Sequence, residues 1–159
     1  MIGVKTYKSF WDYLKTYISG ITTVKIVADE KELEKFLREL ADKEVVLIAV
    51  IPSSDTDYSN LDNKKEDDNS VVYILKKSNQ SDMTEAELLT LRDDTQVQIT
   101  ALKKKLYDMA CDTDSVDSYT KLARRMVPAF HTDPEYDYLG CNGWSISFKW
   151  KTNAYDNAS

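Results

Sequence analysis

One apolar run constrains the fold of this chain more than any other segment. Residues 45–51 read VVLIAVI, are mostly β-branched, and are followed by Pro52. An unbroken apolar run of this length is typical of a strand buried on both faces, because a half-exposed strand would show polar residues at alternate positions. A helix that crosses a membrane needs ~20 such residues. The run therefore predicts a central strand of a sheet and no membrane span.

Three other segments have strand character. Residues 23–28 and 70–77 are rich in β-branched residues. Residues 144–150 alternate strictly: Trp144, Ile146, Phe148 and Trp150 are large and apolar, whereas Ser145, Ser147 and Lys149 are polar. A period of two predicts a half-buried strand with its polar side chains on the outer face.

Helical periods occupy the segments between these strands. Near the N-terminus one face of a helix collects apolar residues at i, i+1, i+4, i+7 and i+8, namely Phe10, Trp11, Leu14, Tyr17 and Ile18. Asp29 and Glu32, and later Thr84 and Glu87, have the spacing of a capping box at a helix start. The second of these precedes an apolar stripe that continues to Met109 and predicts the longest helix. A shorter helix is expected at 119–126.

After the N-terminal helix the expected order is β, α, β, β, α, (α), β. This order favours an α+β fold of the ferredoxin-like βαββαβ type, a four-stranded and mainly antiparallel sheet with helices on one face and an extra N-terminal helix. Residues 1–150 are predicted to form a single domain, with a docking helix at 1–20, and residues 151–159 a flexible tail. In this order the last strand lies at an edge of the sheet.

Composition excludes several classes of function. A formal charge of −6 and a pI near 4.8 argue against free nucleic acid as a partner, because its phosphates are bound mainly by Lys and Arg. Cys111 and Cys141 are too few for a disulfide framework and lack the spacing of a zinc or redox motif. The N-terminus lacks the apolar core of a secretory signal. No cofactor is expected, because the chain has four glycines and no phosphate-binding loop motif.

A single histidine is the one candidate for acid–base catalysis. His131 stands near Asp133 and Glu135, which would suit a histidine oriented by a carboxylate. No serine or cysteine nucleophile motif accompanies it. The sequence therefore favours a histidine in a surface loop and a protein that is not an enzyme.

Residues 53–69 are polar, with six acids against two lysines, and predict a mobile loop. Within it an EF-hand-like spacing places oxygen ligands at Asp55, Asp57, Ser59, Leu61, Asn63 and Glu66. However, Asn60 replaces the glycine of the sharp turn, and strands rather than helices are expected on both sides. These departures favour a solvated acidic loop over a calcium site.

Several features together resemble a family of phage proteins. The N-terminal amphipathic helix, the segment VVLIAVIPSSDTDYS, the long polar-faced helix and the closing LGCNGWSISFKW are similar to small proteins of tailed bacteriophages, especially those that infect gut Bacteroidetes. The resemblance implies a virion component of the neck or tail, in the role of a head–tail connector or tail terminator, whose subunits form rings. It also implies location in the virion, and in the host cytoplasm during assembly.

An assembly protein would bind copies of itself and other virion proteins, and no catalytic residue is carried over from the resemblance. The expected contact residues are Phe10, Trp11 and Leu14 on the N-terminal helix and Ser145, Ser147 and Lys149 on the last strand, whose edge would be open to strand addition. The alternative is a cytosolic acidic module that binds or regulates a basic partner.

Overall fold

The computed structural model describes residues 2–57, 65–78, 81 and 83–153. Within these ranges the chain has an α+β fold in which four helices pack on one mixed, six-stranded sheet. The helices are α1 (Val4–Lys15), α2 (Glu30–Glu39), α3 (Glu85–Cys111) and α4 (Ser118–Ala123). The strands are β1 (Thr23–Val27), β2 (Val45–Val50), β3 (Ser53–Asp57), β4 (Lys65–Lys77), β5 (Met126–Tyr138) and β6 (Cys141–Asn153).

The strand order is β1-β2-β4-β6-β5, with β3 also paired to β4. β1 and β2 are parallel and are joined through α2, whereas the other pairs are antiparallel. β2 and β3 pair with successive parts of the 13-residue β4. Pro52 lies between them, where a residue without a backbone N–H interrupts the ladder. The sheet therefore departs from the predicted four-stranded ferredoxin-like order.

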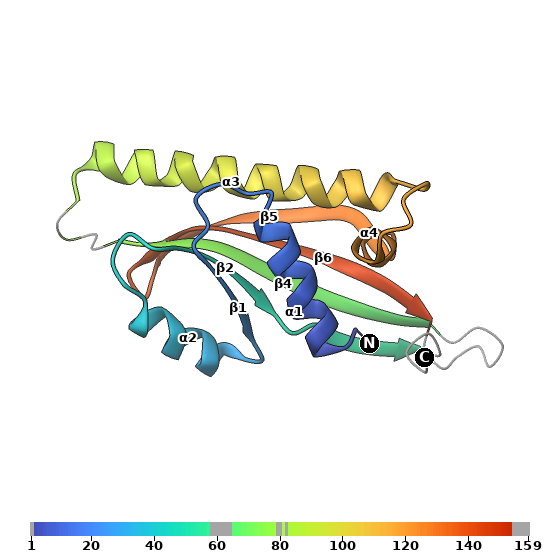
Figure 1. Cartoon of the computed structure of the whole chain (residues 1–159). Coiled ribbons are helices and arrows are strands. Elements are labelled where there is room, and N and C mark those ends of the chain that lie inside the picture. Colours follow the sequence, from blue (N-terminus) through green and yellow to red (C-terminus); the bar gives the residue numbers. More distant parts are fainter. Residues whose placement is uncertain (1, 58–64, 79–80, 82, 154–159) are drawn as a thin grey trace.

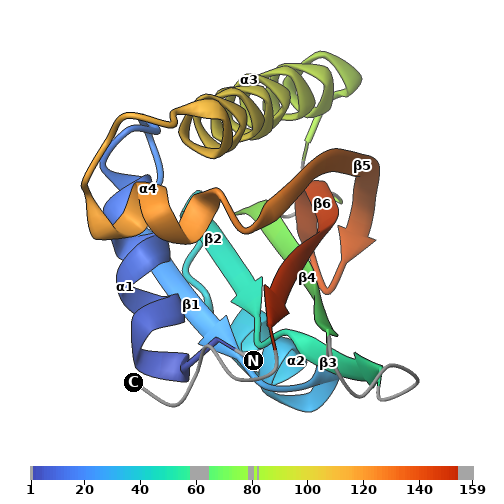
Figure 2. The ribbon, with the colours of Figure 1, turned by 90° about the vertical axis from the view of Figure 1, so that its right-hand side faces the viewer.

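The run at 45–51 is buried on both faces, as predicted. Val45, Leu47 and Ala49 of β2 pack in a core with α1 and α3, whereas Val46 and Ile48 pack in a second core with α2. Figures 1 and 2 show α3 and α2 on opposite sides of the sheet. The prediction that the helices share one face is wrong, because the connection between two neighbouring parallel strands carries α2 over the other face.

α2 and α3 begin where the spacing predicted, α2 with an N-cap and α3 with a full capping box. The Asp29 carboxylate accepts the N–H of Glu32 at 2.9 Å. At α3, the Thr84 hydroxyl oxygen accepts the N–H of Glu87, and the Glu87 carboxylate accepts the N–H of Thr84. α3 runs for 27 residues and buries the predicted apolar stripe against the sheet. The short helix before Pro128 is present as α4.

Helix α1 is part of the core and not a free docking element. Tyr7, Phe10, Trp11 and Leu14 are each 0% exposed. The ring of Phe10 meets those of Trp11 and Trp150 edge-on, with centroid distances of 5.3 and 5.5 Å. The sequence prediction that Phe10, Trp11 and Leu14 contact a partner is corrected, because these side chains already bury their apolar surface against β6 of the same chain.

The last strand is not an edge strand. β6 pairs with β4 along its whole length and with β5 on its other side. β5 was not expected, because Pro128, Pro134 and two irregularities in its pairing hide the strand pattern. The prediction that residues 145–149 offer free backbone groups to a neighbour is therefore wrong.

Two parts of the segment 53–69, which was predicted to be a mobile loop, form strands. Residues 53–57 form β3, and residues 65–69 belong to β4. Asp55, Asp57 and Glu66 of the EF-hand-like spacing thus lie on strands, whereas Ser59, Leu61 and Asn63 fall outside the described residues. The described part of the chain contains no group of three or more His, Cys, Asp or Glu side chains that could hold a metal ion.

Three further sequence predictions concern the C-terminus, the two cysteines and membrane spans. Residues 151–153, expected in the tail, extend β6, and residues 154–159 lie outside the described residues. Cys141 is buried and Cys111 is exposed, and neither is in a disulfide. Among the described helices none has the length and apolarity needed to cross a membrane.

Burial of α1 gives a direct stability prediction. Trp11→Ala is expected to lower the free energy of unfolding by about 3–5 kcal/mol, because it opens a cavity among Tyr7, Phe10 and Phe148. Val4→Ala, at a position that is 51% exposed on the same helix, should change it by less than about 0.5 kcal/mol. Urea denaturation followed by circular dichroism measures both. Equal stability of the two variants would show that α1 is not part of the core.

Candidate functional site

Among the described helices only α2 packs on the second face of the sheet, and it contacts β1, β2 and the ends of β4 and β6. Residues directly opposite in a strand pair point to the same face. Tyr73 of β4 lies opposite Ser145 of β6, and Val71 lies opposite Ser147. In the next pair, Ser147 lies opposite His131 of β5, and Ser145 lies opposite Asp133. We call this surface the open face; it comprises Val71, Tyr73, Ser145, Ser147, Lys149, His131, Asp133 and Glu135.

The middle of the open face is formed by small residues of β6. Gly143, Ser145 and Ser147 occupy successive positions on this side of the strand. A Cβ atom on Gly143 would lie 2.0 Å from the carbonyl oxygen of Ile74, so the close approach of β4 and β6 requires glycine there. These side chains are short, and Ser147 lines one of the hollows on this face.

One hollow on this face is acidic and partly aromatic. It has a volume of about 330 Å³ and is lined by Asp29, Glu30, Leu33, Val50, Val71, Tyr73, Glu135 and Tyr138. Leu33, Val50 and Val71 supply apolar surface. Asp29 and Glu30 come from the start of α2, whereas Glu135 comes from β5. The carboxylates of this acidic hollow therefore approach it from two different elements.

The two tyrosines of the acidic hollow report its electrostatic potential. Burial, followed by the charge of Glu135, raises the pKa of Tyr73 above its ordinary value. Burial also raises the pKa of Tyr138, and Glu30, Glu34 and Glu135 add to the shift. A phenolate is disfavoured in both cases because it would add negative charge to a poorly solvated, negative site.

A second hollow adjoins the first at Val71. It also measures about 330 Å³ and is lined by Asn69, Ser70, Val71, Val127, Ala129, His131, Ser147, Phe148 and Lys149. The exposed Lys149 gives this end of the open face a positive charge. The open face is thus a continuous, charge-polarised surface with apolar patches.

The histidine on this face does not form a catalytic triad. His131 Nε2 lies 3.1 Å from Asp133 Oδ2, with 74% and 56% of the two side chains exposed. Ser147 lies across from His131 in the strand pair. Within the described part of the chain no hydrogen bond joins the two side chains. An exposed imidazole without a bonded nucleophile lacks the arrangement that acyl transfer requires.

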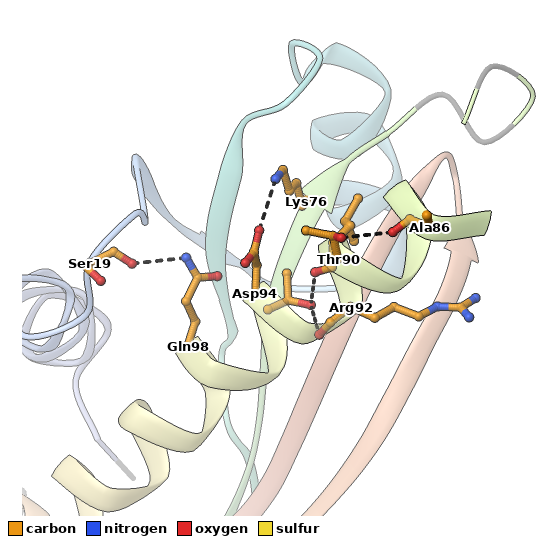
Figure 3. Close-up of polar contacts among 9 residues, drawn as sticks. Ser19, Lys76, Ala86, Thr90, Arg92, Asp94 and Gln98 are labelled. Carbon is orange, nitrogen blue, oxygen red and sulfur yellow. Dashed lines mark hydrogen bonds and ion pairs between the residues drawn. The ribbon is translucent and has the colours of Figure 1, made fainter. Parts of the chain in front are cut away.

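A larger cleft lies on the other side of the sheet, between the first turns of α3 and the end of β4. Its volume is about 530 Å³. At this cleft Lys76 Nζ lies 3.9 Å from an Asp94 carboxylate oxygen (Figure 3). Beside the cleft, Gln98 donates to the carbonyl of Ser19. Lys77, at its rim, donates to the carbonyls of Leu37 and Leu139.

Glu87 is also occupied within this cleft. Hydrogen bonds from the backbone and side chain of Thr84 lower the pKa of Glu87. These polar groups of the cleft already have partners in the chain, so it is a weaker candidate for a binding site than the open face.

The structure separates the contact residues that the sequence predicted into two groups. Phe10, Trp11 and Leu14 lie in the core on the other side of the sheet. Ser145, Ser147 and Lys149 lie together on the open face. Sequence reasoning missed Tyr73, Tyr138 and Glu135 as members of one site. His131, Asp133 and Glu135 stand at every second position. This period of two could have predicted strand β5, with these three side chains on one face of the sheet.

Comparison with known proteins gives no family: no protein-family model and no curated protein sequence matches the chain.

The raised pKa values give a testable dependence on Glu135. The Glu135→Gln variant should have lower pKa values for both Tyr73 and Tyr138, because one negative charge is removed from near each ring. Titration followed by ¹³C NMR of the ring Cζ atoms measures this. Glu39→Gln, which neutralises an exposed carboxylate outside the hollow, is the matched control. Unchanged values in Glu135→Gln would refute the placement of Glu135 beside both rings.

The raised pKa values of Tyr73 and Tyr138 also determine how the stability of the fold depends on pH. Since the pKa of each phenol is higher in the folded state, its contribution to stability is fully present below pH ~10 and is lost as the pH rises through the folded-state value.

Proposed function

We propose that this chain is a non-catalytic assembly protein that binds a neighbouring protein through the open face. The observation that carries the proposal is the open face, with small residues of β6 at its centre and charged residues at its margins. A face of this kind offers apolar surface and specific charges without a deep catalytic cleft.

The edges of the sheet favour docking on the face over strand addition. Pro128 and Pro134 of the edge strand β5 have no N–H to donate, and its pairing is interrupted between Val127 and His131. Prolines, bulges and charges are the features that protect edge strands from pairing with other chains. The opposite edge strand, β1, has only five residues.

The kind of assembly is inferred from the resemblance of the sequence to tailed-phage proteins. We propose a ring-forming subunit of the neck or tail, similar in role to a connector or tail terminator, that binds copies of itself and other virion proteins. In a ring the contact is heterologous, so the open face of one subunit would meet a different surface of the next.

A second candidate function is favoured by the carboxylates of the acidic hollow. An acidic module that binds a basic partner protein would use the same face but remain a monomer by itself. The oligomeric state therefore separates the two candidates.

The test uses a substitution on the open face. Ser147→Lys places a long charged side chain in the second hollow, opposite Val71, which lines both hollows. It should weaken self-association about tenfold or more, which corresponds to about 1.4 kcal/mol. Gln96→Lys adds the same charge at an exposed position on α3 and should leave association unchanged. Sedimentation at several concentrations measures both, and thermal melts check that the variants are folded.

Wild-type protein that stays monomeric at every concentration would contradict the ring and favour the acidic module. Self-association that Ser147→Lys leaves unaltered would contradict the role of the open face.

A further inference from the structure

We propose that the acidic hollow binds the side chain of an arginine presented by the protein that docks on the open face. This inference rests on the proposed function, because it names the group by which that partner is recognised. The partner chemistry is an exposed protein segment with an arginine at its centre.

The charges of the hollow are unbalanced within the chain. Its lining includes Asp29, Glu30 and Glu135 and no Lys, Arg or His. Across the described ranges of the chain, no Lys or Arg side chain forms an ion pair with Glu30 or Glu135. The α3 cleft is different, since there Lys76 faces Asp94. A partner that supplies a cation would therefore complete the acidic hollow.

The carboxylates of the hollow are not equivalent. Asp29 Oδ1 already accepts the N–H of Glu32 at 2.9 Å, as the N-cap of α2. Glu30, one residue later on α2, and Glu135, on β5, are left as acceptors for a ligand. They stand on opposite sides of the hollow, so a group that donates in several directions is needed to reach both.

A guanidinium fits this arrangement better than a compact cation. It is planar and has five N–H donors, which allow it to bond carboxylates at two edges. It also stacks on aromatic rings, and Tyr73 and Tyr138 line the hollow. The aliphatic part of an arginine would lie on Leu33, Val50 and Val71. A metal ion needs ligands converging on one point, and the described residues form no such group.

The raised pKa values of the two tyrosines support the same chemistry. Glu30 and Glu135 each contribute to the shifts of both Tyr73 and Tyr138, so both rings lie in the negative potential of these carboxylates. A neutral phenol with its ring in a negative field is a favourable surface for a cation.

The experiment is an NMR titration of full-length protein with a blocked peptide, acetyl-Gly-Ser-Gly-Arg-Gly-Ser-Gly-amide. The ring signals of Tyr73 and Tyr138 are expected to shift and saturate, with a dissociation constant on the order of millimolar for so small a ligand. The same peptide with citrulline in place of arginine keeps the shape and removes the charge, and should cause no saturable shift. Saturation by both peptides alike, or by neither, would overturn the proposal.

Variants test whether the carboxylates are responsible. The double variant Glu30→Gln/Glu135→Gln should bind the arginine peptide about tenfold more weakly or worse, since charge-assisted hydrogen bonds are lost. Glu39→Gln/Asp93→Asn, which removes two exposed charges outside the hollow, is the charge-matched control and should bind like the wild type. Equal affinity of the two double variants would refute the arginine site.

Failure of the arginine site and failure of the proposed docking face would give different experimental results. If Ser147→Lys abolishes self-association but the arginine peptide does not bind, the arginine site is refuted and the docking face is retained. If the arginine peptide binds as expected but Ser147→Lys has no effect on association, the docking face is refuted, whereas the site for arginine is supported.

Discussion

The structure depends on an unequal covering of the two faces of one sheet. Helix α3 has 27 residues and is ~40 Å long, which matches the ~43 Å of the 13-residue strands β4 and β6. Together with α1 and α4 it covers one face. The other face is left to α2, whose ten residues extend only ~15 Å. A helix of this length reaches β1, β2 and the ends of β4 and β6, so it does not extend over the rest of that face.

The residues on the two faces follow from this difference. On the α3 side the sheet carries Phe148, Trp150 and Ile146, which are buried with the aromatic rings of α1. On the side of α2 the same strand carries Gly143, Ser145 and Ser147, whose small size would leave voids in a core, and the exposed Lys149. The alternation of β6 thus follows from having a core on one side and the open face on the other, and the acids of α2 and β5 give that face negative charge.

The sequence predicted those elements whose period is strong and whose ends carry local signals. The apolar run of β2, the capped starts of α2 and α3 and the alternation of β6 each determine their own structure. β5 was missed because an edge strand with Pro128, Pro134 and bulges lacks the pattern of a central one. That omission placed β6 at the edge. Burial of Trp11 was not predictable either, because the apolar face of an amphipathic helix suits its own sheet and a partner equally well. The acidic hollow joins α2, β4 and β5, which only the tertiary fold brings together.

The central claim is that the open face contacts another protein. The most direct measurement is photo-crosslinking with benzoylphenylalanine in place of Lys149, which is exposed on this face, and in place of Gln96, which is exposed on α3. Irradiation of the assembled protein should give an intermolecular product from position 149 and little from position 96. A position-149 variant that is folded but gives no intermolecular product, or products of equal yield from both positions, would contradict the account.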